Sequence, residues 1–220
     1  MGVVIFDVGK TLVRGTHKNI VLFLYKKGRV PLFFLAKVYF LFLLHKIGLV
    51  KDENVNKISI KVFNSMVMNW NTEDAQEILR ECFEKVIKQK IIPQSLEIVK
   101  SHIKKGDVVI LISAFIGGVI ENLKNYLNLK YAIYPKLEVY NNRFTGKILG
   151  PFPYGKDKVV LVRELIDKEH LSFKESYAYA DRFSDRFLLE SVDNPFVINP
   201  DKKLRKLALE KGWKIYVFNE

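Results

Sequence analysis

The 220-residue sequence contains a single cysteine, Cys82. One cysteine excludes an intramolecular disulfide and any cysteine-rich metal site, and it fits the reducing environment of the cytoplasm. The chain does not open with a charged segment followed by an apolar run, so the sequence predicts no signal peptide. From these absences we expect a cytoplasmic protein.

Histidine is also scarce. The four residues are scattered and form no cluster with spacing typical of metal ligands, and we interpret them as residues of the surface or of the helical segment described below: His17, His45, His102 and His170. No cluster of histidine or cysteine ligands is therefore expected to form the functional site.

Long apolar runs are missing as well. The longest helical run, "PLFFLAKVYFLFLL", has 14 residues and Lys37 as its charged member, whereas a helix that spans a membrane needs about 20 apolar residues. A run of this length is typical of a helix buried in a small bundle or of a segment that lies at a membrane interface. The sequence leaves both interpretations open.

Acidic residues are rare near the start of the chain. The whole sequence carries a net charge of +12, and residues 1–50 hold eight Lys and Arg residues against Asp7 alone. Such a basic region attracts the phosphate groups of nucleic acids, anionic membranes or small substrates, although it is also consistent with a solvated basic face. No base-reading motif accompanies the charge, so nucleic acid is not an expected partner.

The sequence changes in pattern after the first strand. Residues 3–7 form a short apolar run that predicts a buried strand, and residues 17–92 carry only helical periodicity, with Asn71 or Thr72 as a cap of its last helix. From residue 94 onward, strands alternate with helices, the strands covering 107–113, 176–181 and 195–199 and the helices 95–105, 118–128 and 156–168. Residues 131–150 read as a hairpin with Asn141 and Asn142 at its turn.

This order predicts an α/β fold with a parallel sheet covered on both faces. The core would comprise residues 1–14 and 93–220, and residues 15–92 would form an inserted helical cap. Three of the predicted strands end in a polar residue: Asp7, Ser113 and Asp181. Because functional sites of open parallel sheets form at the carboxyl ends of the strands, we expect these residues to meet at one edge, with Asp185 one helical turn beyond Asp181.

Four segments, "FDVGKTL", "ILISA", "GKDK" and "YADRFSDRFLLESV", resemble the four motifs of the haloacid dehalogenase superfamily. The resemblance runs nearly end to end and is greatest to the phosphoserine-phosphatase-like branch (subfamily IB), which has a helical cap after the first motif. It implies a Rossmann-like core and a Mg²⁺-dependent phosphatase that works through an aspartyl-phosphate.

The resemblance also implies a role for each motif residue. Asp7 would be the nucleophile, and a lysine at the start of the next helix, Lys158 or the nearby Lys156, would neutralise the phosphate. The implied phosphate-binding residues are Thr11, which fixes the loop, Ser113, and Ala114 through its backbone N–H. The implied Mg²⁺ site comprises Asp7, the Gly9 carbonyl, Asp181 and, as a supporting residue, Asp185.

One position departs from the family pattern D-x-D-x-T. Gly9 occupies the place of the second Asp, which serves the family as general acid and base, a role that contributes about 10²–10⁴-fold. Three hypotheses follow: a phosphatase that is slow or uses another proton donor, a catalytically lapsed relative that binds phosphorylated ligands or a partner, and a phosphotransferase that retains its aspartyl-phosphate.

The predicted cap is expected to determine the substrate. Its apolar run and basic residues favour a lipid or another amphiphilic phosphomonoester over a purely polar one, although a small-molecule substrate fits the same motifs. Apolar helical faces flanked by Lys and Arg also bind anionic bilayers peripherally. We therefore expect peripheral contact with an anionic membrane as an additional property.

Overall fold

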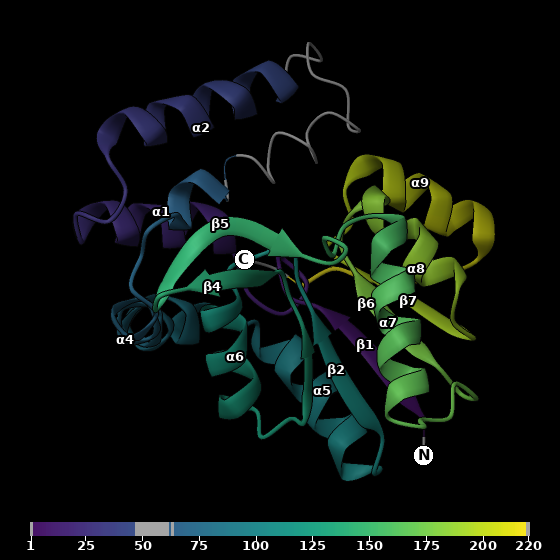
Figure 1. Cartoon of the computed structure of the whole chain (residues 1–220). Coiled ribbons are helices and arrows are strands. Elements are labelled where there is room, and N and C mark those ends of the chain that lie inside the picture. The colour runs from purple at the N-terminus through teal and green to yellow at the C-terminus, as the bar shows by residue number, and fades with distance from the viewer. Residues whose placement is uncertain (1, 47–61, 63, 219–220) are drawn as a thin grey trace.

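The computed structural model describes residues 2–46, 62 and 64–218. Its centre is a six-stranded sheet with the order β3-β2-β1-β6-β7-β8, in which neighbouring strands are parallel (Figure 1). The strands are Val3–Asp7 (β1), Val108–Ile112 (β2), Tyr131–Ile133 (β3), Tyr177–Ala180 (β6), Asn194–Ile198 (β7) and Lys214–Tyr216 (β8). The predicted α/β class with a parallel sheet is confirmed.

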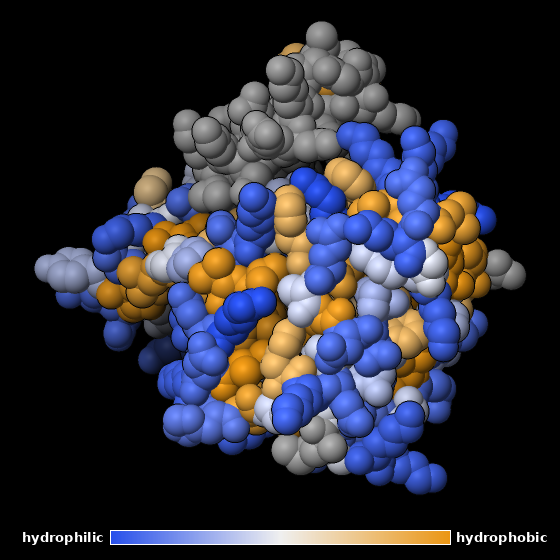
Figure 2. All heavy atoms as spheres, turned by 90° about the vertical axis from the view of Figure 1, so that its right-hand side faces the viewer, coloured by the Kyte–Doolittle hydropathy of each residue, from blue (hydrophilic) through white to orange (hydrophobic). Residues whose placement is uncertain are grey.

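Helices cover both faces of the sheet, which explains why β1 is apolar at four successive positions, Val3 to Phe6, rather than at alternate ones. Val4 and Phe6 share a core with α5 (Pro93–Lys104) and α6 (Gly117–Tyr126). Val3 and Ile5 share the opposite core with α7 (Lys156–Lys168), α8 (Arg186–Glu190) and α9 (Lys202–Lys211). On the side of the molecule shown in Figure 2, hydrophilic residues surround areas of apolar residues.

A helical segment connects β1 to α5. It contains α1 (Thr16–Lys26), α2 (Leu32–Lys46) and α4 (Thr72–Cys82), and α4 continues as the π-helical turn η1 (Phe83–Ile87) and the 3₁₀ turn η2 (Lys88–Lys90). The two ends of the segment lie side by side, because Val13 bridges Ile91 and the Arg14 N–H donates to the Lys90 carbonyl at 2.9 Å. An insertion between two neighbouring strands requires such a return, and the division into core and cap domains stays a prediction.

Two details of the helical segment bear on the sequence analysis. The Asn71 side chain accepts hydrogen bonds from the N–H groups of Glu73 and Asp74, so it is the N-cap of α4, and such caps stabilise a helix by about 1 kcal/mol. Of the predicted helical stretch 17–92, residues 47–61 and 63 lie outside the described residues, and 64–67 are helical.

The hairpin predicted over 131–150 is partly wrong. Only β4 (Lys136–Tyr140) and β5 (Arg143–Leu149) form it, with Asn141 and Asn142 at positive φ angles of 47° and 57° in the turn. β3 instead pairs with β2 in the main sheet. The hairpin lies against residues 69–72, since the Asn69 N–H donates to the Phe144 carbonyl at 2.8 Å.

The expectation of a surface or cap position is wrong for His102. This α5 residue is buried in the core, with Nδ1 2.8 Å from Asp107 Oδ2 and Nε2 2.9 Å from the Tyr179 hydroxyl. Both ring nitrogens therefore have partners, which is how a polar ring is accommodated in a core. Tyr179 in turn stacks on Phe6 with ring centroids 4.7 Å apart.

No helix among the described residues is long and apolar enough to cross a membrane. In the part of the chain that the structure describes, the longest apolar helix is α2, which has 15 residues. This length corresponds to about 22 Å at about 1.5 Å per residue.

Candidate active site

The strand order reverses direction at β1. The chain passes from β1 to β2 and β3 on one side and then returns to β6, β7 and β8 on the other. Open parallel sheets form a crevice at such a point, outside the carboxyl ends of the strands. Asp7 is the last residue of β1, and Ser113 and Asp181 directly follow β2 and β6. Asp7 lies level with Ile112, so these three residues emerge at the same edge.

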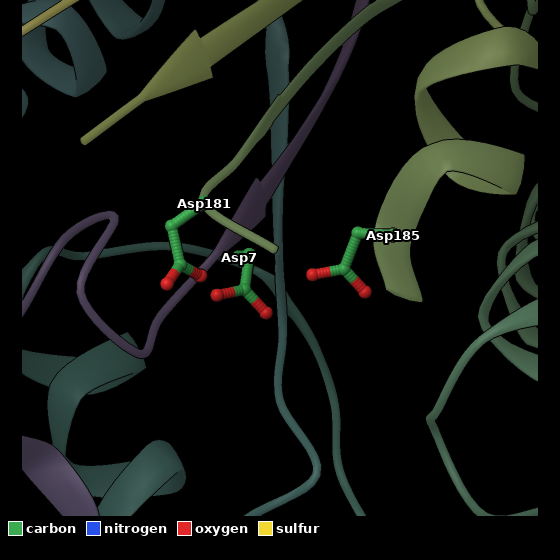
Figure 3. Close-up of side chains that lie close together, drawn as sticks. All are labelled: Asp7, Asp181 and Asp185. Atoms are coloured by element: carbon green, nitrogen blue, oxygen red, sulfur yellow. The ribbon is translucent and has the colours of Figure 1, made fainter. Parts of the chain in front are cut away.

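Three buried carboxylates meet there. Oxygens of Asp7, Asp181 and Asp185 lie within 4.8 Å of one another, and each of the three residues is at most 6% exposed. Figure 3 shows Asp7 between the other two, with the three carboxylates turned toward a common region. One oxygen of Asp181, Oδ1, is buried without a hydrogen-bond partner among the described groups. A buried carboxylate oxygen without a partner is costly unless a cation or donor occupies the site in the working protein.

Lys158 supplies the positive charge at this site. Its Nζ lies 2.6 Å from Asp7 Oδ1 and 2.8 Å from Asp185 Oδ1, and its side chain is buried. Lys156, the alternative that the sequence left open, is exposed and lies with its Nζ 5.0 Å from the Phe187 ring. Of the two candidates, only Lys158 reaches the carboxylates.

A glycine determines how the chain enters α7. Gly155 is the N-cap residue with φ 57° and ψ −127°, a backbone conformation that only glycine adopts without strain. α7 begins at the next residue, which places Lys158 in its first turn. The sequence "GKDK" therefore provides both the glycine that the turn needs and the lysine that reaches the carboxylates.

Burial and charge shift the protonation equilibria of these groups. Burial raises the pKa of Asp7, an effect that the neighbouring Lys158 ammonium partly offsets. Burial, followed by the charge of Asp7, raises the pKa of Asp181 well above its ordinary value. Burial lowers the pKa of Lys158, but the carboxylates of Asp185 and Asp7 outweigh it and raise the pKa. The cluster thus holds more negative charge than one lysine compensates, which favours a bound cation.

Hydrogen bonds with buried residues hold the loop after β1 in place. Thr11 is fully buried, its Oγ1 lies 3.5 Å from Asp7 Oδ2, and its carbonyl accepts a 2.6 Å hydrogen bond from the Ser95 hydroxyl. Ser95, in the first turn of α5, was missed by the sequence analysis. No motif marks it, because its role depends on the return of the chain 84 residues later.

The loop after β2 contains Ser113 and Ala114. Ser113 is buried, its N–H donates to the Ile133 carbonyl at 2.9 Å, and its Oγ accepts the Phe115 N–H at 3.2 Å. Ala114 is half-buried beside it. The Ser113 hydroxyl hydrogen is therefore available to donate to an anion at the strand end.

Gly9 is half-buried and does not have the positive φ of glycines such as Gly155. Its neighbour Lys10 does, with φ 61°, and is exposed. This left-handed conformation costs a lysine about 1–2 kcal/mol relative to the right-handed one. Substituting Gly9 would not force a residue into the left-handed region, whereas Lys10 already occupies it.

Arg182 is a further positively charged residue at the site. The sequence analysis did not assign it there. Its Nε lies 3.7 Å from Asp181 Oδ2, and its side chain is half-exposed. The available signal was its position directly after the strand-end acid. Arg182 therefore adds positive charge at the open side of the cluster.

Comparisons with known proteins agree with this geometry. The family model described as haloacid dehalogenase-like hydrolase matches residues 4–190. A Mycobacterium tuberculosis protein named phosphoserine phosphatase is 30% identical over 231 residues, covering 97% of this chain and 70% of that protein. A Streptomyces azureus protein named inhibition of morphological differentiation protein is 29% identical over 157 residues, covering 71% of this chain and 56% of that protein. The chain thus spans little more than half the length of the Streptomyces relative.

Among solved structures, a Bordetella pertussis protein of unknown function superimposes with a TM-score of 0.82. The two are 24% identical, and the superposition covers 97% of each chain. This likeness shows that the arrangement of strands and helices in this chain also occurs in another protein.

Proposed function

This chain belongs to the haloacid dehalogenase-like hydrolases, and we propose that it hydrolyses a phosphate monoester through an aspartyl-phosphate on Asp7. The observation that carries the proposal is the buried contact of Lys158 with Asp7 at the carboxyl edge of the sheet. A carboxylate held beside an ammonium in a crevice is suited to attack phosphorus, because the cation offsets the repulsion between two anions. The name of the tuberculosis relative supports the same reaction class.

Mg²⁺ fits the residues of this site. Asp7 and Asp181 would hold it, with the Gly9 carbonyl as a further oxygen and Asp185 as support. The observation in favour is that Asp181 Oδ1 is buried and has no hydrogen-bond partner in the described part of the chain. When bound, Mg²⁺ supplies charge neutralisation for the phosphate and for the transition state. An all-oxygen donor set is what this ion prefers.

The protein's own groups would then act in order. An Asp7 carboxylate oxygen attacks phosphorus, the bond from phosphorus to the ester oxygen breaks, and the alcohol leaves with a proton from solvent or from another donor. The Ser113 hydroxyl and the Ala114 N–H bind phosphate oxygens, and Lys158 offsets the added charge. Water then attacks the phosphorus of the aspartyl-phosphate, which releases inorganic phosphate and restores the Asp7 carboxylate.

Gly9 favours a second candidate function. Glycine provides a carbonyl but no proton donor, so both proton transfers lose a contribution of about 10²–10⁴-fold. A site of this kind would bind phosphorylated ligands while turning them over slowly or not at all. Lys158, Asp185 and Arg182 all act on the pKa of Asp7, and none of these three is an obvious replacement for the missing general acid.

The proposed substrate is a small phosphomonoester. The apolar and basic helical segment that follows β1 favours one with an amphiphilic leaving group, such as a lysophospholipid phosphate. In this interpretation residues 15–92 act as the cap that contacts the leaving group.

Steady-state phosphate release from a panel of phosphomonoesters, with Mg²⁺ or with EDTA, tests the proposal. The panel should contain an aryl phosphate, phosphoserine and a lysophospholipid phosphate. Turnover that requires Mg²⁺ and disappears in Asp7→Asn supports a phosphatase. Saturable binding of the same esters without turnover by the wild-type protein supports the binding function instead.

A further inference from the structure

The α2 helix exposes a continuous apolar stripe, which we define as Leu32, Phe33, Ala36, Tyr39, Phe40 and Leu43. These positions recur three or four residues apart, so they share one side of the helix. Their five large side chains are between 44% and 72% exposed. Phe34, which points to the other side of the helix, is 6% exposed and belongs to the core.

Nothing in the described part of the chain covers this stripe. Figure 1 shows α2 as an outer element, separated from the sheet by other parts of the chain. A helix that is apolar on all sides normally buries all of them, and contiguous exposed apolar surface usually marks an interaction site. A stripe of this kind is suited to a partner that accepts apolar side chains.

The charge of the surrounding segment restricts the kind of partner. Residues 8–51 contain nine Lys and Arg residues and neither Asp nor Glu. Lys26 ends α1, Lys27 is its C-cap residue, and Arg29 lies in the turn that leads to α2. Lys27 and Arg29 pair with Glu81 and Asp74 of α4, yet their side chains stay 40% and 37% exposed. The approach to the stripe is thus basic.

A hollow of about 260 Å³ extends the apolar surface at the first turn of α2. Its wall includes Phe33 and Phe34 of the helix together with Met66, Met68 and Trp70 from the chain before α4, and Arg29 also lines it. Apolar walls beside a cation are complementary to an amphiphile that carries an anionic group.

We propose that the α2 stripe docks this protein on the surface of an anionic phospholipid bilayer, with the helix lying in the plane of the interface. Such a surface offers acyl chains to the stripe and phosphates to the basic residues at the same time. A second copy of the chain would bring two acid-free segments together, which like-charge repulsion disfavours. The helix is about 22 Å long, too short for the roughly 30 Å hydrocarbon core, so it would lie on the bilayer rather than cross it.

The test compares two double variants of the full chain that differ in position but not in chemistry. Leu32→Ser with Tyr39→Ser removes two stripe residues that are 65% and 72% exposed. Leu209→Ser with Tyr140→Ser removes residues of the same types that are 67% and 70% exposed on α9 and β4. Both variants are checked for folding by circular dichroism and thermal unfolding. Truncation of exposed side chains should leave the fold intact.

Binding is measured by co-sedimentation with vesicles of neutral phosphatidylcholine, alone or mixed with anionic phosphatidylglycerol. We expect the wild-type protein to bind the mixed vesicles and to dissociate as salt rises. The stripe variant should bind about tenfold or more weakly, since partitioning scales with buried apolar area. The matched control should bind like the wild type.

Three results would overturn the proposal. They are the absence of binding to anionic vesicles at low salt, equal loss of binding in both double variants, and a stable dimer in solution that the stripe variant alone dissociates. The proposal does not depend on catalysis, because the stripe lies on α2 and the carboxylates lie at the strand ends. Phosphatase activity without vesicle binding would therefore contradict it while leaving the proposed function intact.

Discussion

The Lys158 ammonium lies 2.6 Å from the Asp7 carboxylate, although 151 positions separate the two residues in the chain. Both side chains are less than one-tenth exposed. Lys158 also contacts Asp185, so one cation lies between two buried carboxylates. This arrangement links the stability of the site to its chemistry.

Replacing Lys158 with Met should abolish phosphatase activity and destabilise the protein. Removal of one partner from a buried pair leaves uncompensated charge and costs about 3–5 kcal/mol. Urea unfolding at neutral pH measures the loss. Lys156→Met is the matched control, because that side chain is exposed and its loss should change stability by less than about 0.5 kcal/mol. Equal effects of both changes would contradict the role given to Lys158.

Asp181→Asn should stabilise the metal-free protein, and the gain should grow with pH. The folded-state pKa of Asp181 is raised, so the stability it contributes is complete below its unfolded pKa and is lost as pH rises through the folded pKa. The neutral amide avoids this loss. Unfolding in EDTA from about pH 4 to about pH 8 measures the difference.

Two controls accompany this measurement. Surface acids whose pKa is lowered in the folded state affect both proteins equally, so their contribution cancels when the two free energies of unfolding are subtracted. Lys158 stays charged throughout this pH range. Mg²⁺ should reverse the order at neutral pH, because it stabilises the folded wild type by binding to it. A stability difference that does not vary with pH would show that Asp181 is not destabilised by ionisation in the folded protein.

Replacing Gly9 with Asp should raise phosphatase activity, and Gly9→Asn should not. The carboxyl group restores part of the contribution of about 10²–10⁴-fold from general acid and base catalysis, whereas the amide has a similar size but exchanges no proton. The gain should be larger for alkyl phosphates than for aryl phosphates, since an aryl oxide leaves readily without protonation. Turnover rates of the three proteins on both ester types make the measurement. A flat or lower rate in a folded Gly9→Asp variant would show that another group already transfers the proton.

Lys10→Gly should increase the free energy of unfolding by about 1 kcal/mol, because glycine adopts the positive φ of 61° without a Cβ penalty. Urea denaturation provides the comparison. Lys206→Gly, in the middle of α9, should have the opposite sign and cost about 0.5–1 kcal/mol. If Lys10→Gly is destabilising too, the lysine side chain makes a contribution that exceeds its backbone strain.

The elements that the sequence predicts well are those whose signal is local. The apolar runs of β1 and β2 and the periodicity of α7 specify these elements, and the polar residues Asp7, Ser113 and Asp181 follow directly from where the strands end. β3 was assigned wrongly because a three-residue strand followed by Pro135 carries too few positions for its pattern to reveal a parallel partner.

The contacts of the site require the folded chain. The choice between Lys156 and Lys158 depends on which one faces Asp7 once Gly155 has turned the backbone. The same holds for the contact of Ser95 with Thr11, 84 positions away, and for that of His102 with Tyr179, 77 positions away. No rule based on sequence spacing connects such residues. Their burial and the distances between their atoms in the folded chain identify them.

The most direct test of the central claim is to identify the phosphorylated residue. Wild-type protein is mixed with an aryl phosphate and Mg²⁺, quenched in acid and digested, and the peptide that contains Asp7 is analysed by mass spectrometry. An aspartyl-phosphate on Asp7 that requires Mg²⁺ and is absent in Asp7→Asn is the expected result. Phosphate release by the wild-type protein without any label on Asp7, or turnover that persists in Asp7→Asn, would contradict it.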